Sequence, residues 1–188
     1  MKYEPEKHHR RSIRLQGYDY SQPGAYFVTI CTQDRACLFG DVVNDEMELN
    51  ALGVIVRKEW FRSADIRQEI KLHHDEFVVM PNHVHGIVWL IGDDVGAHGR
   101  APLQWQRLAK SLGSFIAGFK SAVTKCINEY RHTPGTPVWQ RNYYEHVIRD
   151  DASLDRTRQY IIDNPARWAF DRENPLVTTP EAENAWLA

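Results

Sequence analysis

Apolar residues in this chain form both short runs and helical patterns, and the order of the two constrains the fold more than any other feature. Runs rich in β-branched and aromatic residues, which are typical of strands, occupy residues 25–32, 71–80, 83–91 and 139–148. Apolar residues recur every three or four positions, as in amphipathic helices, over 50–68, 103–130 and 153–163. The expected order is strand, helix, two strands, helix, strand and a final helix.

This is the order of a split βαβ, or ferredoxin-like, fold. It predicts an α+β structure in which an antiparallel sheet carries helices on one face. Pro81-Asn82 separates the two central runs, which should pair as antiparallel inner strands. Asn44-Asp45 is a turn signal that allows a small hairpin before the first helix. Asn50 and Ser153 are the expected N-caps of the first and last helices, and Asn164-Pro165 should end the last one.

Length and composition exclude several classes of protein. A chain of 188 residues suits one domain with terminal extensions. The three cysteines form no CxxC pair, which argues against both a disulfide scaffold and a zinc finger. The apolar runs are far shorter than the roughly eighteen residues that a membrane span needs, and the basic start lacks the apolar run of a signal peptide. We therefore expect a cytoplasmic globular domain.

The net charge of −2 hides an uneven distribution. Residues 1–23 form a basic arm, 24–168 the expected domain and 169–188 an acidic tail. Residues 100–131 carry six lysines and arginines against one glutamate. Basic regions of this kind can face DNA phosphates, although solvated helix faces have the same composition. The candidate DNA-binding residues are Arg10, Arg11, Arg14, Arg100, Arg107, Lys110, Lys120 and Lys125.

The sharpest local motif is Pro81-Asn-His-Val-His-Gly86. On a strand, residues i and i+2 point to the same face, so His83 and His85 should lie side by side. Two imidazoles so placed can bind one divalent ion. A His-x-His pair is a weak signal by itself, because two histidines that only form hydrogen bonds leave the same pattern. The apolar flanks favour a site, since buried polar groups need partners.

A second motif is Tyr160-Ile-Ile-Asp-Asn164-Pro165. In a helix, Tyr160 and Asn164 are one turn apart on the same face. A phenol and an amide oxygen could then both reach a metal-bound phosphate. The alternative is a tyrosine at the edge of the core followed by an ordinary helix end, because a residue before proline disfavours the helical conformation.

Together, PNHVHGIV, VWQRNYYEHVIRD and Tyr160 followed by IIDNP resemble the single-tyrosine HUH transposases. Within that group they are most similar to the REP-associated tyrosine transposases of bacteria. The segments YFVTICTQDR and GSFIAGFKSAV are similar as well, and the resemblance spans about residues 10–168. HUH stands for histidine, a bulky hydrophobic residue and histidine, and Val84 fills the middle position. The resemblance implies a ferredoxin-like sheet, the fold already expected from the order of the elements.

The resemblance also implies a reaction. The protein would be a metal-dependent single-strand DNA endonuclease and strand transferase that acts on hairpin-flanked DNA. His83, His85 and Asn164 would hold Mg²⁺ or Mn²⁺, and Tyr160 would form a covalent 5′-phosphotyrosine and release a 3′-hydroxyl. Phenols ionise near pH 10, so a nearby cation should help the tyrosine to react. Magnesium prefers oxygen ligands, so two histidines suit manganese better.

Alternatives to this assignment exist for the nucleophile, the function and the assembly. Tyr143 and Tyr144 are rival nucleophiles, but neither has a potential ligand one helical turn away. The protein could instead be a domesticated module that binds hairpin DNA without turnover, or a metal-dependent hydrolase with no covalent step. Insertion-sequence relatives act as dimers that exchange active-site helices, whereas REP-associated members can work as monomers. The expected partner is single-stranded or hairpin DNA, bound by a monomer or a homodimer.

Overall fold

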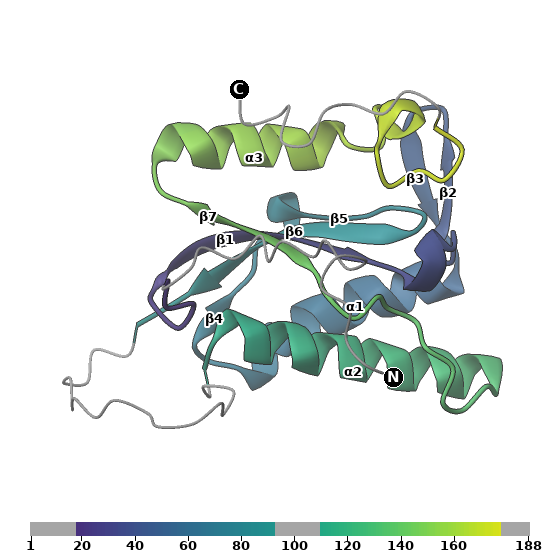
Figure 1. The fold of residues 1–188 in the computed structure, drawn as a ribbon, viewed down its shortest axis with the longest axis horizontal. Coiled ribbons are helices and arrows are strands. Elements are labelled where there is room, and N and C mark those ends of the chain that lie inside the picture. Colours follow the sequence, from purple (N-terminus) through teal and green to yellow (C-terminus); the bar gives the residue numbers. More distant parts are fainter. Residues whose placement is uncertain (1–17, 93–109, 178–188) are drawn as a thin grey trace, which may run out of the picture.

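The computed structural model describes residues 18–92 and 110–177, which fold around a five-stranded antiparallel sheet (Figure 1). Four strands lie in the order β4 (Ile70–Lys71), β6 (His83–Leu90), β1 (Gly24–Cys31) and β7 (Tyr144–Ile148). β5 (Phe77–Val79) also pairs with β6. The α+β fold with an antiparallel sheet, predicted from the order of the elements, is confirmed.

The centre of the sheet is the pairing of β1 with β6. The two strands are in register from Gly24 opposite Leu90 to Cys31 opposite His83, along the whole of both strands. β7 pairs with the other edge of β1. This register sets Thr29 opposite His85, so it decides which side chains can meet the histidine pair.

The helices lie on both faces of the sheet (Figure 1), so the prediction of helices on one face holds for the two helices of the split βαβ order and is wrong for the additional last helix. α1 (Ala51–Ile66) and α2 (Leu112–Arg131), the two helices of the split βαβ order, share one face, and α3 (Asp151–Asp163) covers the other. Because side chains alternate along a strand, β6 gives Val84 and Val88 to the large core with α1 and α2, and Ile87 to a smaller apolar cluster with α3. His83 and His85 are two and four positions from Ile87 on the strand, so they point to the same face, toward α3. None of the helices in the described ranges is long and apolar enough to cross a membrane.

Most of the local signals predict the observed elements. Asn50 caps α1, with its side-chain oxygen accepting from the backbone N–H groups of Leu52 and Gly53. The hairpin of β2 (Gly40–Val43) and β3 (Glu46–Leu49) turns at Asn44-Asp45, where both residues have positive φ. Such a two-residue turn matches the right-handed twist of the paired strands.

Four elements differ from the sequence prediction. α2, expected over 103–130, begins at Leu112 after its cap Ser111. The run 71–80 is not one strand, because a 3-10 turn, η2 (His74–Glu76), separates β4 from β5 and turns Glu76 into the interior. The last helix is capped by Asp150 rather than by Ser153, whose N–H donates to the Asp150 carboxylate at 2.7 Å. β7 is shorter than the run 139–148, and Trp139 forms only an isolated bridge with Thr32.

Gly86 allows α1 to pack closely against the strand that carries the histidines. A Cβ at this position would lie 2.6 Å from Cζ2 of Trp60 and 3.0 Å from Cδ2 of Phe77. Trp60 is fully buried and its ring stacks on that of Phe77, with 4.5 Å between centroids. The space beside Gly86 is thus filled by rings that have little freedom to move.

We predict that Gly86→Ala destabilises the protein by about 1–3 kcal/mol, the usual cost of overpacking a core. Gly118→Ala is the matched control, because a Cβ there meets no atom within 4 Å. Gly118 lies inside α2, where alanine is favoured over glycine by roughly 0.5–1 kcal/mol. Urea unfolding of the two variants should therefore shift the midpoint in opposite directions. Equal shifts of the two unfolding midpoints would show that contact with Trp60 does not destabilise the Gly86→Ala variant.

Candidate functional site

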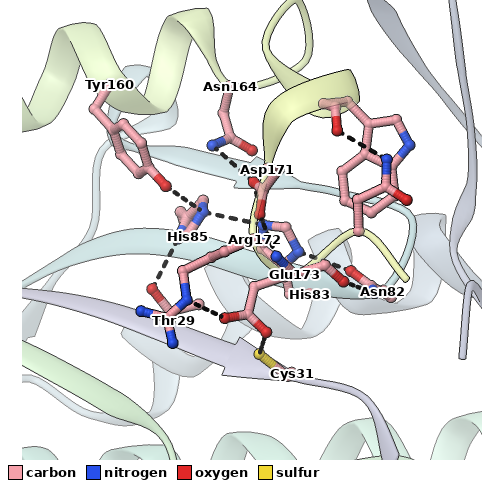
Figure 2. A network of polar contacts seen from close by, with 12 residues as sticks. Thr29, Cys31, Asn82, His83, His85, Tyr160, Asn164, Asp171, Arg172 and Glu173 are labelled. Carbon is pink, nitrogen blue, oxygen red and sulfur yellow. Dashed lines mark hydrogen bonds and ion pairs between the residues drawn. The ribbon is translucent and has the colours of Figure 1, made fainter. Parts of the chain in front are cut away.

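The two histidine side chains converge on one point beneath α3 (Figure 2). The Nε2 atoms of His83 and His85 are 3.0 Å apart, and the ring centroids are separated by 4.5 Å. His83 is 0% and His85 2% exposed. The i, i+2 spacing on β6 thus brings both imidazoles together, as the sequence predicts, with their inner nitrogens facing each other.

The outer nitrogen of each ring is held by a neighbouring side chain. Nδ1 of His83 lies 2.8 Å from Oδ1 of Asn82, and Nδ1 of His85 lies 2.9 Å from Oγ1 of Thr29. An amide oxygen can only accept, so His83 carries its proton on Nδ1 and leaves a lone pair on Nε2. The Thr29 hydroxyl can accept from His85 in the same way. Partners of this kind orient histidines that bind metals.

Burial keeps both histidines neutral. It lowers the pKa of His83, although the nearby carboxylates of Asp171 and Glu173 act in the opposite direction. It lowers the pKa of His85 further, and the neighbouring His83 adds to this effect. Neutral imidazole is the form that binds metal ions. Two lone pairs that face each other at 3.0 Å repel unless a cation or a proton lies between them.

A carboxylate completes the cluster. Oδ2 of Asp171 is 3.7 Å from Nε2 of His83, and one ligand atom from each of His83, His85 and Asp171 lies within 4.8 Å of the others. Asp171 is buried and follows a short turn, η3 (Trp168–Phe170). Asp171 falls within 169–188, the segment predicted to be an acidic tail, and was not predicted as a site residue. No spacing rule marks it, because its place depends on how the chain turns back after α3.

Asn164 lies next to this carboxylate. Its Nδ2 is 3.4 Å from Oδ2 of Asp171, and the residue is 2% exposed. Its Oδ1 makes no hydrogen bond of good geometry within the described residues, although the amide is close enough to His83 to favour the protonated ring. A buried amide oxygen without a partner is costly, and coordination of a cation would satisfy it.

Residues 171–173 close over the histidines (Figure 2). The backbone oxygen of Glu173 accepts from Nδ2 of Asn82 at 2.6 Å. The Glu173 carboxylate pairs with Arg35 at 3.1 Å and accepts from the Cys31 thiol at 3.4 Å. These contacts attach the segment after η3 to β1 and to the loop before β6.

Tyr160 reaches the same point from α3. Its hydroxyl is 3.4 Å from Nε2 of His85, and its ring meets the His85 ring with 5.1 Å between centroids. Phe27 packs edge-on against Tyr160, with centroids 5.9 Å apart, and stacks on His85. The structure therefore brings together the four residues His83, His85, Tyr160 and Asn164 that the two sequence motifs single out.

The rival tyrosines lie in apolar surroundings. Tyr144 packs with the small cluster beneath α3, and its ring meets Phe27 edge-on at 6.3 Å. Tyr143 packs against the large core, and Nζ of Lys120 lies 5.8 Å from its ring centroid. Tyr143 thus belongs to the core packed against α1 and α2, whereas the histidine pair faces α3.

The candidate DNA-binding residues are not gathered into one surface by the described structure. Arg10, Arg11, Arg14, Arg100 and Arg107 lie outside the described residues. Lys110 and Lys125 are exposed, and Lys125 is 3.9 Å from Glu129 one helical turn away. Lys120 points inward instead: its ammonium donates to the backbone oxygens of Gln140 and Asn142, both at 2.8 Å, and burial lowers its pKa to about 8.

Comparison with known proteins finds relatives in sequence and solved structures with a similar fold. The chain is 40% identical over 178 residues to an uncharacterized protein of Haemophilus influenzae, covering 91% of this chain and 96% of the relative. It is 28% identical over 156 residues to a second H. influenzae protein, described as a "Putative REP-associated tyrosine transposase", covering 81% of this chain and 76% of that one.

The fold is also shared with a solved structure of a REP-associated tyrosine transposase bound to a REP hairpin. The TM-score is 0.56 at 20% identity, over 82% of this chain and 73% of that one. No family model matches the chain. The sequence relatives, the shared fold and the ordered motifs around His83, His85 and Tyr160 agree with one another. The chain is thus similar in sequence to a putative REP-associated tyrosine transposase and shares the fold of a solved one.

Proposed function

We propose that the protein cuts and rejoins single-stranded DNA beside hairpins, through a covalent bond between Tyr160 and a 5′ phosphate. The observation that carries this proposal is the contact of three groups. The Tyr160 hydroxyl lies 3.4 Å from Nε2 of His85, and this atom lies 3.0 Å from Nε2 of His83. A nucleophile thus lies directly beside a pair of neutral, converging imidazoles.

The donor set fits a divalent cation such as Mn²⁺ or Mg²⁺. His83 and His85 would supply two nitrogens, and Asp171 and Asn164 two oxygens, of which hard cations prefer at least some. The carboxylate of Asp171 makes the site more favourable for magnesium than the two histidines alone. A bound cation would withdraw charge from the oxygens of the phosphate under attack.

The reaction of the chain's own residues is a substitution at phosphorus. The Tyr160 oxygen forms a bond to phosphorus as the bond from phosphorus to the 3′ oxygen breaks. The phenol proton passes to water, and the departing 3′ oxygen takes up a proton to become a 3′-hydroxyl. Contacts with Phe27 and His85 hold the phenol ring in place, which lowers the entropic cost of reaching the transition state. The phosphotyrosine bond keeps the energy of the phosphodiester, so rejoining needs no nucleotide cofactor.

Single-stranded DNA next to a hairpin is the substrate that suits this site best. A REP-associated tyrosine transposase has been solved with a REP hairpin bound, which supports hairpin DNA as the ligand here. The histidines are almost fully buried, so a phosphodiester can reach them only if part of the surrounding structure moves. A flexible single strand can enter such a closed site, whereas the stacked bases of a duplex hold its backbone rigid.

The first prediction from this proposal concerns the metal. His83→Ala/His85→Ala should abolish Mn²⁺ binding in isothermal titration calorimetry, and Asp171→Ala should weaken it about tenfold or more. His132→Asn is the control, because His132 is exposed at the end of α2 in a left-handed conformation that asparagine tolerates. Unchanged Mn²⁺ affinity in the double variant would remove the histidines from the metal site.

The second concerns the nucleophile. Tyr160→Phe should bind hairpin DNA about as well as the parent, and should form no protein–DNA adduct on a denaturing gel. Tyr143→Phe and Tyr144→Phe are the controls and should keep the adduct. Asn164→Ala should be milder, with cutting partly restored by extra Mn²⁺.

The same gel separates the alternative functions. An adduct formed by Tyr160→Phe would place the nucleophile elsewhere. Cutting by the parent with no adduct at any time would identify a hydrolase. Hairpin binding with no cutting in Mn²⁺ would identify a DNA-binding module without turnover.

The third concerns the form of the DNA. Binding should favour a hairpin with single-stranded flanks over a blunt duplex of the same sequence, because splayed bases can stack on side chains. The logarithm of the affinity should fall steeply with the logarithm of salt concentration. Lys110→Ala, which removes an exposed charge, should reduce this slope by about one. Equal affinity for both DNA forms in a filter-binding assay would contradict the proposal.

A further inference from the structure

We infer that Glu76 and Arg158 are positioning residues for the nucleophile: together with Trp89 they form a clamp that ties α3 to the strand bearing the histidines. This inference rests on the proposed function, since it takes Tyr160 as the attacking group. The three residues, called the Glu76 clamp below, lie outside the cluster of His83, His85 and Asp171.

The Glu76 clamp joins three elements through one buried carboxylate. Oε2 of Glu76 accepts from Nε1 of Trp89 at 2.6 Å, and Oε1 accepts from Nε and Nη2 of Arg158 at 2.9 and 2.7 Å. Glu76 is 1% exposed. A buried carboxylate is costly unless it is paired and hydrogen-bonded, so the structure strongly favours keeping Arg158 on it. The result is a link between η2, β6 and α3.

On β6, the clamp and the candidate ligands share one face. His83, His85, Ile87 and Trp89 alternate with residues of the opposite face, because side chains point the same way at every second position. Ile87 and Trp89 both pack in the apolar cluster beneath α3. The anchor point of the clamp therefore lies on the same rigid strand as both imidazoles.

On α3, Arg158 and Tyr160 lie on opposite edges of the buried stripe. Leu154, Thr157 and Ile161 form this stripe. Each residue advances by about 100° around a helix, so Arg158 falls to one side of Ile161 and Tyr160 to the other. A rotation of α3 about its axis that separated Arg158 from Glu76 would therefore also displace the phenol from its position beside His85.

Apolar packing by itself would fix this rotation poorly. α3 contributes only Leu154 and Ile161 as fully buried members of the small cluster in the described residues. Contacts of this kind are non-directional. The two N–H bonds from Nε and Nη2 of Arg158 converge on Oε1 of Glu76, and charge-assisted bonds of this kind are directional as well as strong. The clamp thus supplies the orientation that the apolar contacts lack.

The test compares Arg158→Lys with Arg156→Lys, at an exposed position on the same helix. Both keep the positive charge, but only Arg158→Lys loses a paired guanidinium fork. At saturating hairpin DNA and Mn²⁺, the single-turnover rate of adduct formation should fall about tenfold or more in Arg158→Lys, as expected for a misplaced reacting group. The Kd values for hairpin DNA and Mn²⁺ should stay within about twofold. Arg156→Lys should match the parent.

Hydrogen exchange and a second variant test the clamp further, and the exchange measurement does not require the protein to form an adduct. In protein without DNA or metal, amide hydrogen exchange in α3 should be faster in Arg158→Lys than in Arg156→Lys. Glu76→Gln, which retains the Trp89 contact, should act in the same direction as Arg158→Lys. If the parent forms an adduct and both lysine variants react equally fast, the clamp is overturned and the proposed function stands.

If the parent forms no adduct, the proposed function fails, and unchanged exchange in α3 overturns the clamp separately. A parallel loss of rate, Mn²⁺ affinity and thermal stability in Glu76→Gln and Arg158→Lys would also overturn it. That outcome would show a general structural role rather than the placement of Tyr160.

Discussion

The backbone pairing of β1 with β6 determines where both histidines of the site lie. Its register sets Thr29 beside His85 and brings β1, with Phe27, beneath the ring of Tyr160. A slip of one residue would turn each side chain of β6 to the other face. His83 and His85 would then enter the apolar core beneath α1 and α2, where burial without partners is costly. The site therefore depends on the same hydrogen bonds that hold the sheet together.

The two faces of the sheet divide stability and chemistry between them. The face toward α1 and α2 carries the large apolar cluster, with fully buried side chains such as Trp60, Phe115 and Phe119. The face toward α3 has a smaller apolar cluster beside the buried polar groups of the site. Because the larger apolar area lies on the first face, burial there contributes most of the hydrophobic stabilisation. The second face can consequently hold polar groups whose burial is unfavourable on its own.

The sequence predicts those features of the fold and site that depend on short-range periodicity. The order of the elements, the cap at Asn50 and the shared face of His83 and His85 follow from spacings of two to four residues. Asp171 and the pairing of Arg158 with Glu76 could not be found in this way. The contact of Arg158 with Glu76 joins residues 82 positions apart, so it depends on the path of the whole chain. The 3-10 turn within 71–80 was missed for a related reason, since its inward Glu76 is compensated by Trp89 of β6 and by Arg158 of α3.

Tyr160 and Asn164 lie one turn apart on α3, so any movement of this helix shifts the nucleophile and a candidate ligand together. His83 and His85, by contrast, belong to a central strand paired on both sides. The reaction proposed here must run in both directions, because rejoining requires a DNA hydroxyl to attack the phosphotyrosine at the same phosphorus. In this proposal, a fixed strand would hold the phosphate during both cutting and rejoining. A separate helix would carry the nucleophile to the phosphate. The phosphate can stay on β6 while α3 controls whether the phenol is in line with it. The directional contact between Arg158 and Glu76 then matters most while the phenol lies beside His85, where an error in the rotation of α3 would leave both histidines in place and the phenol out of reach.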